Sequence, residues 1–281
     1  MFDSGGNTDL DPEKADTLTV GVVIEPRAIP ELSLAIDYYR IEIDNSIGAI
    51  QADAAVALCF DSNDIDSAFC RGILRGPSGN IAEVTNPQFN LALSKASGID
   101  LIIDYRLDLP GRLGLGGNTA WLAVELFGTR AIDSGRQETP ASPFIDCAGE
   151  FGGLCVGTAV GNFIIAPGTR ANTRLTYYSG PAAISLNWEW IGGLENNIDT
   201  FNAVRGTDFG SELDTAGSRN YFQLSARYQT SDRIEIYGGV SNLFKEQPPL
   251  LGFGATQSNT APQLYDVFGR RYFLGLSYRW E

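Results

Sequence analysis

The sequence predicts an all-β protein, an antiparallel transmembrane β-barrel built as a meander. Three features of its 281 residues indicate this fold. Apolar and polar residues alternate with a period of two, and short and long connections follow one another. Glycine and aromatic residues are also abundant, with 32 Gly, 15 Phe and 11 Tyr. Because successive side chains of a strand point to opposite faces, this alternation gives each strand one apolar and one polar face.

The alternation is clearest in two segments. In "AISLNWEW" the apolar face carries Ile184, Leu186, Trp188 and Trp190, and the polar face carries Ser185, Asn187 and Glu189. In the closing "YFLGLSYRW" one face carries Tyr272, Leu274, Leu276, Tyr278 and Trp280, and the other carries Phe273, Gly275, Ser277 and Arg279.

The same pattern predicts nine strands along the chain. These are Asp16–Ile24, Glu31–Asp44, Phe89–Leu107, Arg112–Phe127, Arg170–Tyr178, Ala182–Ile191, Arg219–Gln229, Asp232–Asn242 and Gly269–Trp280. A further hairpin is expected at residues 72–84. A strand of about 12 residues, tilted near 45°, spans about 28 Å, which matches the apolar band of an outer membrane.

The connections predict which end of the barrel is which. Tight turns rich in Pro, Gly, Ser or Asp are expected at residues 25–30 and near Pro110, Pro181 and Ser231. Long irregular stretches are expected at residues 45–87, 128–169, 192–218 and 243–268. Short turns at one end and long loops at the other are typical of outer-membrane barrels. A soluble β-sandwich or repeat protein is the alternative, since its strands also alternate.

In the barrel interpretation, the apolar faces contact lipid and the polar faces line a water-filled lumen. The lumen-facing candidates are Arg174, Glu189, Arg227 and Glu235. The candidates for the interfacial aromatic girdle are Trp188, Trp190, Tyr278 and Trp280. The lumen candidates line a solute path or, alternatively, pair with one another and with water.

The composition excludes several function classes. With 34 acidic and 20 basic residues the net charge is −14, which argues against nucleic-acid binding. The absence of histidine removes the Ser-His-Asp triad and imidazole-based zinc sites, so we predict neither an enzyme nor a cofactor. No run of 18 apolar residues is present. The acidic N-terminus is unlike a signal peptide, so either the protein is cytoplasmic or the front of the polypeptide is missing.

The four cysteines form two local pairs, Cys59 with Cys70 and Cys147 with Cys155. Such pairs in irregular stretches predict disulfides made in an oxidising compartment, which argues against the cytoplasm. Metal binding is the alternative, but the spacing fits no CxxC template and no histidine completes a site.

Two loop segments have a composition that suggests ligands. Asp61, Asp64 and Asp66 lie between the first two cysteines, yet the segment lacks the Gly and Glu of an EF-hand, so a solvated loop tip is favoured. Residues 152–161 are rich in glycine, but no strand and helix flank them as a nucleotide cradle requires.

The count of nine strands is odd, whereas bacterial single-chain barrels have even counts with both ends in the periplasm. We therefore expect residues 1–281 to be the C-terminal portion of a larger barrel, with the earlier strands and any plug domain absent from this chain.

Four segments also resemble one known family. They are "GGNTDLDPEKADTLTVGV" (5–22), "SKASGIDLIIDYRL" (94–107), "YGGVSNLFKEQPP" (237–249) and the closing "YFLGLSYRW". Together they resemble the last part of the barrel of TonB-dependent outer-membrane receptors and transporters. The most specific element is Asn242-Leu243-Phe244 followed by two prolines, shortly before an aromatic terminal strand.

The resemblance implies a 22-stranded barrel in the outer membrane of a Gram-negative bacterium, with about nine or ten of its strands in this chain. It implies ligand-gated active uptake of a siderophore, cobalamin or saccharide type ligand whose identity is unknown. The implied partners are the lipid bilayer, the barrel-assembly machinery, and TonB through the missing N-terminal part. The chain departs from the family pattern by ending in Trp280-Glu281. A passive porin-like channel and an outer-membrane enzyme or adhesin are the alternatives.

Overall fold

A single curved sheet forms most of the protein. The computed structural model describes residues 2–3, 8–49, 52–67, 69–85, 88–140, 142–152, 155, 165–206, 208, 210, 213–252 and 259–280. The main sheet contains β2 (Lys14–Ile24), β3 (Leu32–Asp44), β8 (Leu93–Leu109), β9 (Ala120–Gln137), β12 (Thr169–Ser179), β13 (Ala182–Ile191), β16 (Arg219–Ser231), β17 (Ile234–Ser241) and β18 (Arg271–Tyr278).

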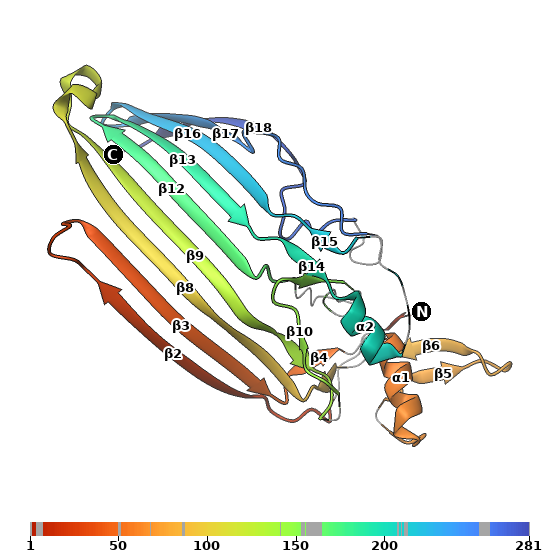
Figure 1. Ribbon diagram of the computed structural model, residues 1–281. Coiled ribbons are helices and arrows are strands. Elements are labelled where there is room, and N and C mark those ends of the chain that lie inside the picture. Colours follow the sequence, from red (N-terminus) through yellow and green to blue (C-terminus); the bar gives the residue numbers. More distant parts are fainter. Residues whose placement is uncertain are drawn as a thin grey trace.

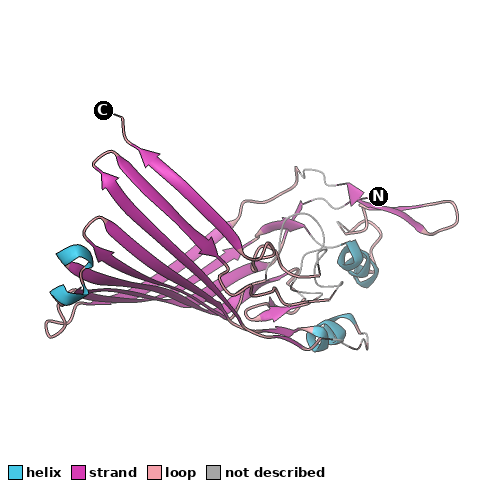
Figure 2. Cartoon of the chain, turned by 90° about the horizontal axis from the view of Figure 1, so that it is seen from above, coloured by secondary structure: helices cyan, strands magenta, loops and turns pink. Residues whose placement is uncertain are grey.

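These strands pair in chain order and always antiparallel, as β18-β17-β16-β13-β12-β9-β8-β3-β2. Figures 1 and 2 show the resulting curved sheet. In the described part of the chain, β2 and β18 each pair along one edge only, so the barrel is partial. The predicted all-β antiparallel barrel meander is therefore confirmed.

Short connections and long connections lie at opposite ends of the sheet. The turns at 25–31, 180–181 and 232–233 lie at one end, here called the turn end, together with the C-terminus (Figure 1). The long connections and the N-terminus lie at the other end, here called the loop end.

The predicted strand bounds hold within four residues except for β9. The predicted start at Arg112 is wrong, because Arg112 lies in a 3-10 turn (η1, Gly111–Leu113) that is followed by another (η2, Leu115–Gly117). The tight turn predicted near Pro110 is therefore a ten-residue connection, 110–119. The Leu115 amide anchors it by donating to Ser179 Oγ over 2.8 Å.

Strand β9 also continues to Gln137, where an irregular stretch was predicted from Gly128. This extension pairs with the start of β8 across a bulge next to Ser97. Its exposed side carries charged groups: Asp133 pairs with Lys95 Nζ at 2.9 Å and accepts from Ser97 Oγ at 2.6 Å. The alternating pattern therefore disappears here although the strand does not end.

The N-terminal segment and the long connections contain small elements of their own. They are β1 (Phe2–Asp3), β4 (Ile47–Ala49), α1 (Ala52–Ser62), β5 (Ile73–Arg75), β6 (Ile81–Thr85), β7 (Gln88–Asn90), β10 (Ile145–Asp146), β11 (Glu150–Phe151), β14 (Leu194–Asn196), α2 (Ile198–Arg205) and β15 (Thr215–Ala216). The hairpin expected at 72–84 is formed by β5 and β6. Neither helix was predicted. In the described part of the chain no helix has the length and hydropathy that a membrane crossing requires.

The two faces of the sheet differ in what covers them. The face that carries Ile184, Leu186 and Trp188, here called the outer face, is bare: Trp188 is 37%, Leu276 63% and Tyr278 42% exposed. The opposite, inner face is partly covered, because Tyr221 on this face packs among residues of the long connections. These exposed apolar residues rule out the stacked core of a soluble sandwich.

On the inner face, aromatic rings lie over glycines of the neighbouring strand. Tyr237 is directly opposite Gly275, and a Cβ on that glycine would lie 2.3 Å from Tyr237 Cζ. Tyr39 is likewise opposite Gly98, where a Cβ would lie 2.6 Å from the Tyr39 hydroxyl oxygen. The missing side chain gives each ring room to lie flat on the sheet, which fixes the register locally.

We expect Gly275→Val to displace the Tyr237 ring and to destabilise the sheet by about 1–3 kcal/mol, as overpacking typically does. The measurement is urea unfolding of the protein refolded in lipid vesicles. In the Tyr237→Ala background the same valine should cost much less, because no ring then opposes it. An equal cost in both backgrounds would contradict this account of the pair.

The bare outer face predicts a face-dependent response to charge. Leu224 lies on the outer face of β16, and its neighbour Gln223 lies on the inner face. We expect Leu224→Arg to cost about 2–4 kcal/mol in a bilayer, since arginine on the lipid side is poorly solvated, and Gln223→Arg to cost little. Heat-modifiable gel mobility across a urea series measures the folded fraction. Equal losses for the two variants would argue against lipid on this face.

Candidate functional site

The inner face of the sheet and the connections folded onto it form the candidate site. All four lumen candidates lie on this face. Arg174 Nη1 lies 3.7 Å from Glu125 Oε2, and Glu189 forms an ion pair with Arg170. The structure brings only Arg227 and Glu235 together, in the wall of one cavity of about 350 Å³.

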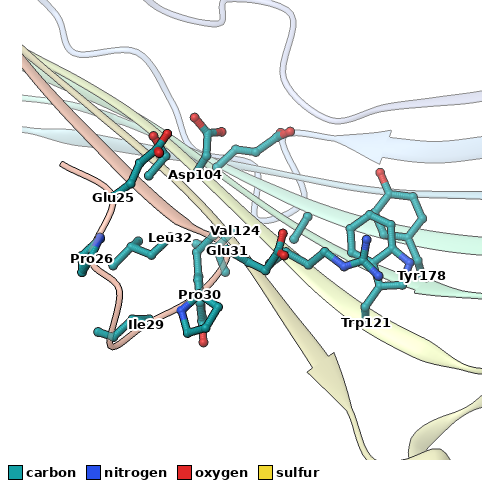
Figure 3. A pocket seen from close by; sticks show the side chains of 15 residues that line it. Glu25, Pro26, Ile29, Pro30, Glu31, Leu32, Asp104, Trp121, Val124 and Tyr178 are labelled. Carbon is teal, nitrogen blue, oxygen red and sulfur yellow. The ribbon is translucent and has the colours of Figure 1, made fainter. Parts of the chain in front are cut away.

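A larger cavity, of about 540 Å³, lies at the turn end of the inner face. The turn between β2 and β3 forms one side, with Ile29 and Pro30, and Trp121 and Tyr178 lie at the other side (Figure 3). Its lining is rich in carboxylates. The acidic members are Glu25, Glu31, Asp104 and Glu125, and the one basic member is Arg106.

A row of cations and aromatic rings crosses the inner face, and three of its four members, Arg106, Trp121 and Tyr178, line this cavity. The rings of Trp121 and Tyr178 stack with centroids 3.9 Å apart and planes 12° apart. The guanidinium carbon of Arg106 lies 4.6 Å from the Trp121 ring centroid, and that of Arg227 lies 5.8 Å from the Tyr178 ring centroid. Cation–π contacts of this kind hold arginines against the wall, so four strands are linked side chain to side chain.

A third cavity, of about 390 Å³, lies on the inner face toward the loop end. Strands β3, β8, β9 and β12 line it together with Ala166 and Pro167, which precede β12. Its aromatic members are Tyr39 and Phe127. Neither residue stands out in the sequence pattern, because their contact with this cavity depends on the pairing of strands far apart in sequence.

Three long connections pack into one apolar core at the loop end, here called the loop layer. Its buried residues are Phe151, Ile191, Leu194, Ala216, Tyr221, Leu251, Ala261 and Tyr265. The short β11 and β14 pair in parallel, and β14 also pairs with β15.

Burial raises the pKa of Tyr265 to about 12. Burial also raises the pKa of Glu150, with further contributions from Asp146 and Glu195.

The structure joins the cysteines as two disulfides, Cys59–Cys70 and Cys147–Cys155, with sulfur–sulfur distances of 2.02 and 2.14 Å. Both lie in connections at the loop end. Asp64 and Asp66 are exposed, and the side chain of Asp61 lies outside the described residues.

No group of three or more His, Cys, Asp or Glu side chains that could hold a metal ion occurs among the described residues. Most of the glycine-rich segment 152–161 lies outside the described residues, as does Glu281.

Comparison with known proteins identifies the family. A family model described as "TonB dependent receptor-like, beta-barrel" matches residues 1–243. The chain belongs to the TonB-dependent receptor-like β-barrel family. No curated protein sequence matches it.

Several solved structures of receptors and of a transporter share the fold of the chain. A mutant ferric enterobactin receptor from Pseudomonas aeruginosa, in complex with enterobactin, is 15% identical with a TM-score of 0.60; the match covers 98% of this chain and 32% of that one. The siderophore receptor PirA from Acinetobacter baumannii is 16% identical with a TM-score of 0.56, and the match covers 98% of this chain and 33% of that one. The copper transporter OprC is 15% identical with a TM-score of 0.52, and the match covers 96% of this chain and 32% of that one. The chain thus spans about a third of the length of these structures.

As a member of the TonB-dependent receptor family, the protein resides in the outer membrane of a Gram-negative bacterium.

The girdle candidates lie at both ends of the sheet. Trp188 and Trp190 lie toward the loop end of β13, and Trp188 Nε1 donates to Asn220 Oδ1 over 2.9 Å. Tyr278 and Trp280 lie at the turn end, with their rings edge to face at 4.9 Å.

The raised pKa of Glu150 predicts a pH dependence of the loop layer. The folded state retains the Glu150 proton to higher pH than the unfolded chain. The stability linked to this proton is therefore present below the ordinary glutamate pKa of about 4.3 and is lost as pH rises through the raised value. We expect Glu150→Gln to raise the melting temperature at neutral pH and to change it little at about pH 3. Glu83→Gln, on the β5–β6 hairpin, is the control; stabilisation at both pH values would contradict the assignment.

Proposed function

We propose that this chain forms part of the wall of an outer-membrane receptor that takes up a scarce small ligand by ligand-gated active transport. One observation carries the proposal. The sheet has a bare apolar outer face and a polar inner face, and the long connections fold onto the inner face at one end. That arrangement suits a wall with lipid on one side and a solute path, capped by a binding layer, on the other.

The ligand class is proposed from the family, since the similar structures are described as receptors for ferric enterobactin and siderophores and as a copper transporter. A siderophore is the first candidate, and cobalamin or a saccharide is the second. Coupling to TonB would pass through a part of the receptor outside this chain, and insertion would use the barrel-assembly machinery. The proposal includes no enzymatic activity. The chain would act as the C-terminal portion of a longer barrel, which agrees with its match to about a third of each similar structure.

Whole-cell uptake tests this function. The full-length polypeptide is expressed in a strain that lacks its own outer-membrane receptors, and cells are supplied with ⁵⁵Fe-enterobactin, ⁵⁵Fe-ferrichrome, ⁵⁷Co-cobalamin or ¹⁴C-maltotriose. We expect saturable uptake of one probe that disappears when TonB is deleted. Uptake that is linear with concentration and persists without TonB would instead identify a passive channel. Absence of uptake of every probe would overturn the proposed ligand classes.

A further inference from the structure

We propose that an aromatic and basic patch on the outer face, at the loop end of β13, β16 and β17, binds a phosphate group of lipopolysaccharide in the outer leaflet of the membrane. The inference goes beyond the proposed transport, because it names a lipid partner of the wall and not a solute. The residues of this patch, called the phosphate patch below, are Trp188, Phe222, Phe244, Lys245 and Arg270.

The turn that follows β17 carries the sequence element Asn242-Leu243-Phe244, and a buried side chain holds it. Asn242 is 4% exposed and has a positive φ of 50°, a conformation that asparagine adopts more readily than most residues. Its Oδ1 accepts from the Glu246 amide at 2.8 Å, and its Nδ2 donates to the Glu246 carbonyl at 2.9 Å. The Leu243 amide donates to the Phe222 carbonyl on β16 over 2.7 Å. The turn is therefore fixed against the wall, and Phe244 has a defined position.

Phe244 folds back onto the outer face and joins two rings of the wall. Its ring meets the Phe222 ring edge to face with centroids 5.2 Å apart, and the Phe222 ring lies nearly parallel to that of Trp188 at 6.2 Å. Phe222 and Trp188 are directly opposite each other in the register of β13 and β16. Phe244 nevertheless remains 67% exposed. Since aromatic rings on the lipid side of a barrel lie at the level of the headgroups, these three rings mark the depth of the membrane interface.

Two cations lie beside these rings. Arg270 donates from Nη2 to the Leu243 carbonyl, which places its guanidinium next to the backbone of Phe244. Lys245 follows Phe244 in the turn and is exposed. The Leu243 carbonyl uses one of the five N–H donors of the guanidinium, so the others are available to an anion. Arginine beside phosphate forms strong charge-assisted hydrogen bonds.

The acidic residues close to the patch in sequence are paired with other arginines. Glu246 lies next to Lys245 in the chain, but its carboxylate is 3.5 Å from Arg219 Nε. Asp266 lies 3.3 Å from Arg271 Nη2. Arg219 and Arg271 occupy inner-face positions of their strands.

In the described part of the chain neither Lys245 nor Arg270 forms an ion pair. The outer face therefore presents two uncompensated positive charges at the level of the aromatic rings. An anion that lies at this depth in the membrane complements them.

The location of the patch selects the lipid. Long connections of outer-membrane barrels are extracellular, so the outer leaflet surrounds the loop end of the outer face. Lipopolysaccharide in that leaflet carries phosphate groups on its glucosamine disaccharide, directly above the acyl chains. A phosphate at that level reaches the two cations while the acyl chains contact the rings of Phe222 and Phe244. Free phosphate has no acyl chain to make the second contact.

Native mass spectrometry of the full-length protein in detergent tests the phosphate patch. The protein is titrated with lipid A, with lipid A whose phosphates have been removed by phosphatase, with phosphatidylglycerol and with inorganic phosphate. EDTA is present, because divalent cations would otherwise bridge phosphate to carboxylates. We expect lipid A to bind most tightly. Lys245→Gln should weaken its binding about fivefold, and Lys245→Gln with Arg270→Gln about 25-fold, as expected for one and two basic residues at an anionic membrane surface.

Arg112→Gln is the matched control, because Arg112 is an exposed arginine at the turn end and should not affect lipid A binding. Phe244→Ala should weaken binding although it leaves every charge in place. Heat-modifiable gel mobility checks that each variant is folded. If Arg270→Gln disturbs the turn, Lys245→Gln decides alone.

Unchanged lipid A binding by Lys245→Gln would overturn the proposal. Equal binding of dephosphorylated lipid A would show that phosphate is not recognised, and equal binding of phosphatidylglycerol would exclude selection of lipopolysaccharide. Displacement of lipid A by an equal concentration of inorganic phosphate would identify a site for the free ion instead. The readout requires no uptake, so it separates this inference from failure of the proposed transport.

Discussion

The structure depends on a requirement that each strand of the wall must meet, namely contact with two different solvents. A strand in hydrocarbon must satisfy its backbone groups through its neighbours, and its side chains then alternate between lipid and the interior. The row Leu175, Leu186 and Leu224 crosses three strands on the outer face in direct register. A slip of one residue would exchange this row for the polar row beside it, so the register is fixed by burial in lipid rather than by a protein core.

The consequence is that the protein core is not inside the sheet but at its end. Ile191 and Tyr221 belong to strands of the wall and also to the core of the loop layer. The wall thereby positions the connections, and the connections return to the inner face through Ala166 and Pro167. This shared packing explains how long, irregular segments hold a defined surface over the inner face, where the cavities lie.

The contact of each strand with two solvents also explains how much of the fold was predictable from the sequence. Strands within the apolar band show a period of two, so β13 was predicted with its bounds and both faces. Beyond the band the outer face meets water, and residues 128–137 lost the pattern while remaining a strand. Helix α1 lacks a clear apolar stripe, and the packing of Phe151 and Leu251 into one core depends on folding of two separate connections. Local patterns carry no information on such contacts.

The inner face of the sheet therefore carries two chemically different zones, one at the turn end and one toward the loop end. At the turn end, four carboxylates and one lining arginine surround the larger cavity, and Arg106 is held flat by Trp121. Toward the loop end, Phe127 is half exposed on the same face, and the nearby cation Arg170 is paired with Glu189. The acidic zone at the turn end would therefore favour positively charged groups, whereas the zone toward the loop end carries less net negative charge. Since both zones lie on the same strands, β8 and β9, a shift in the register of that pair would alter both at once.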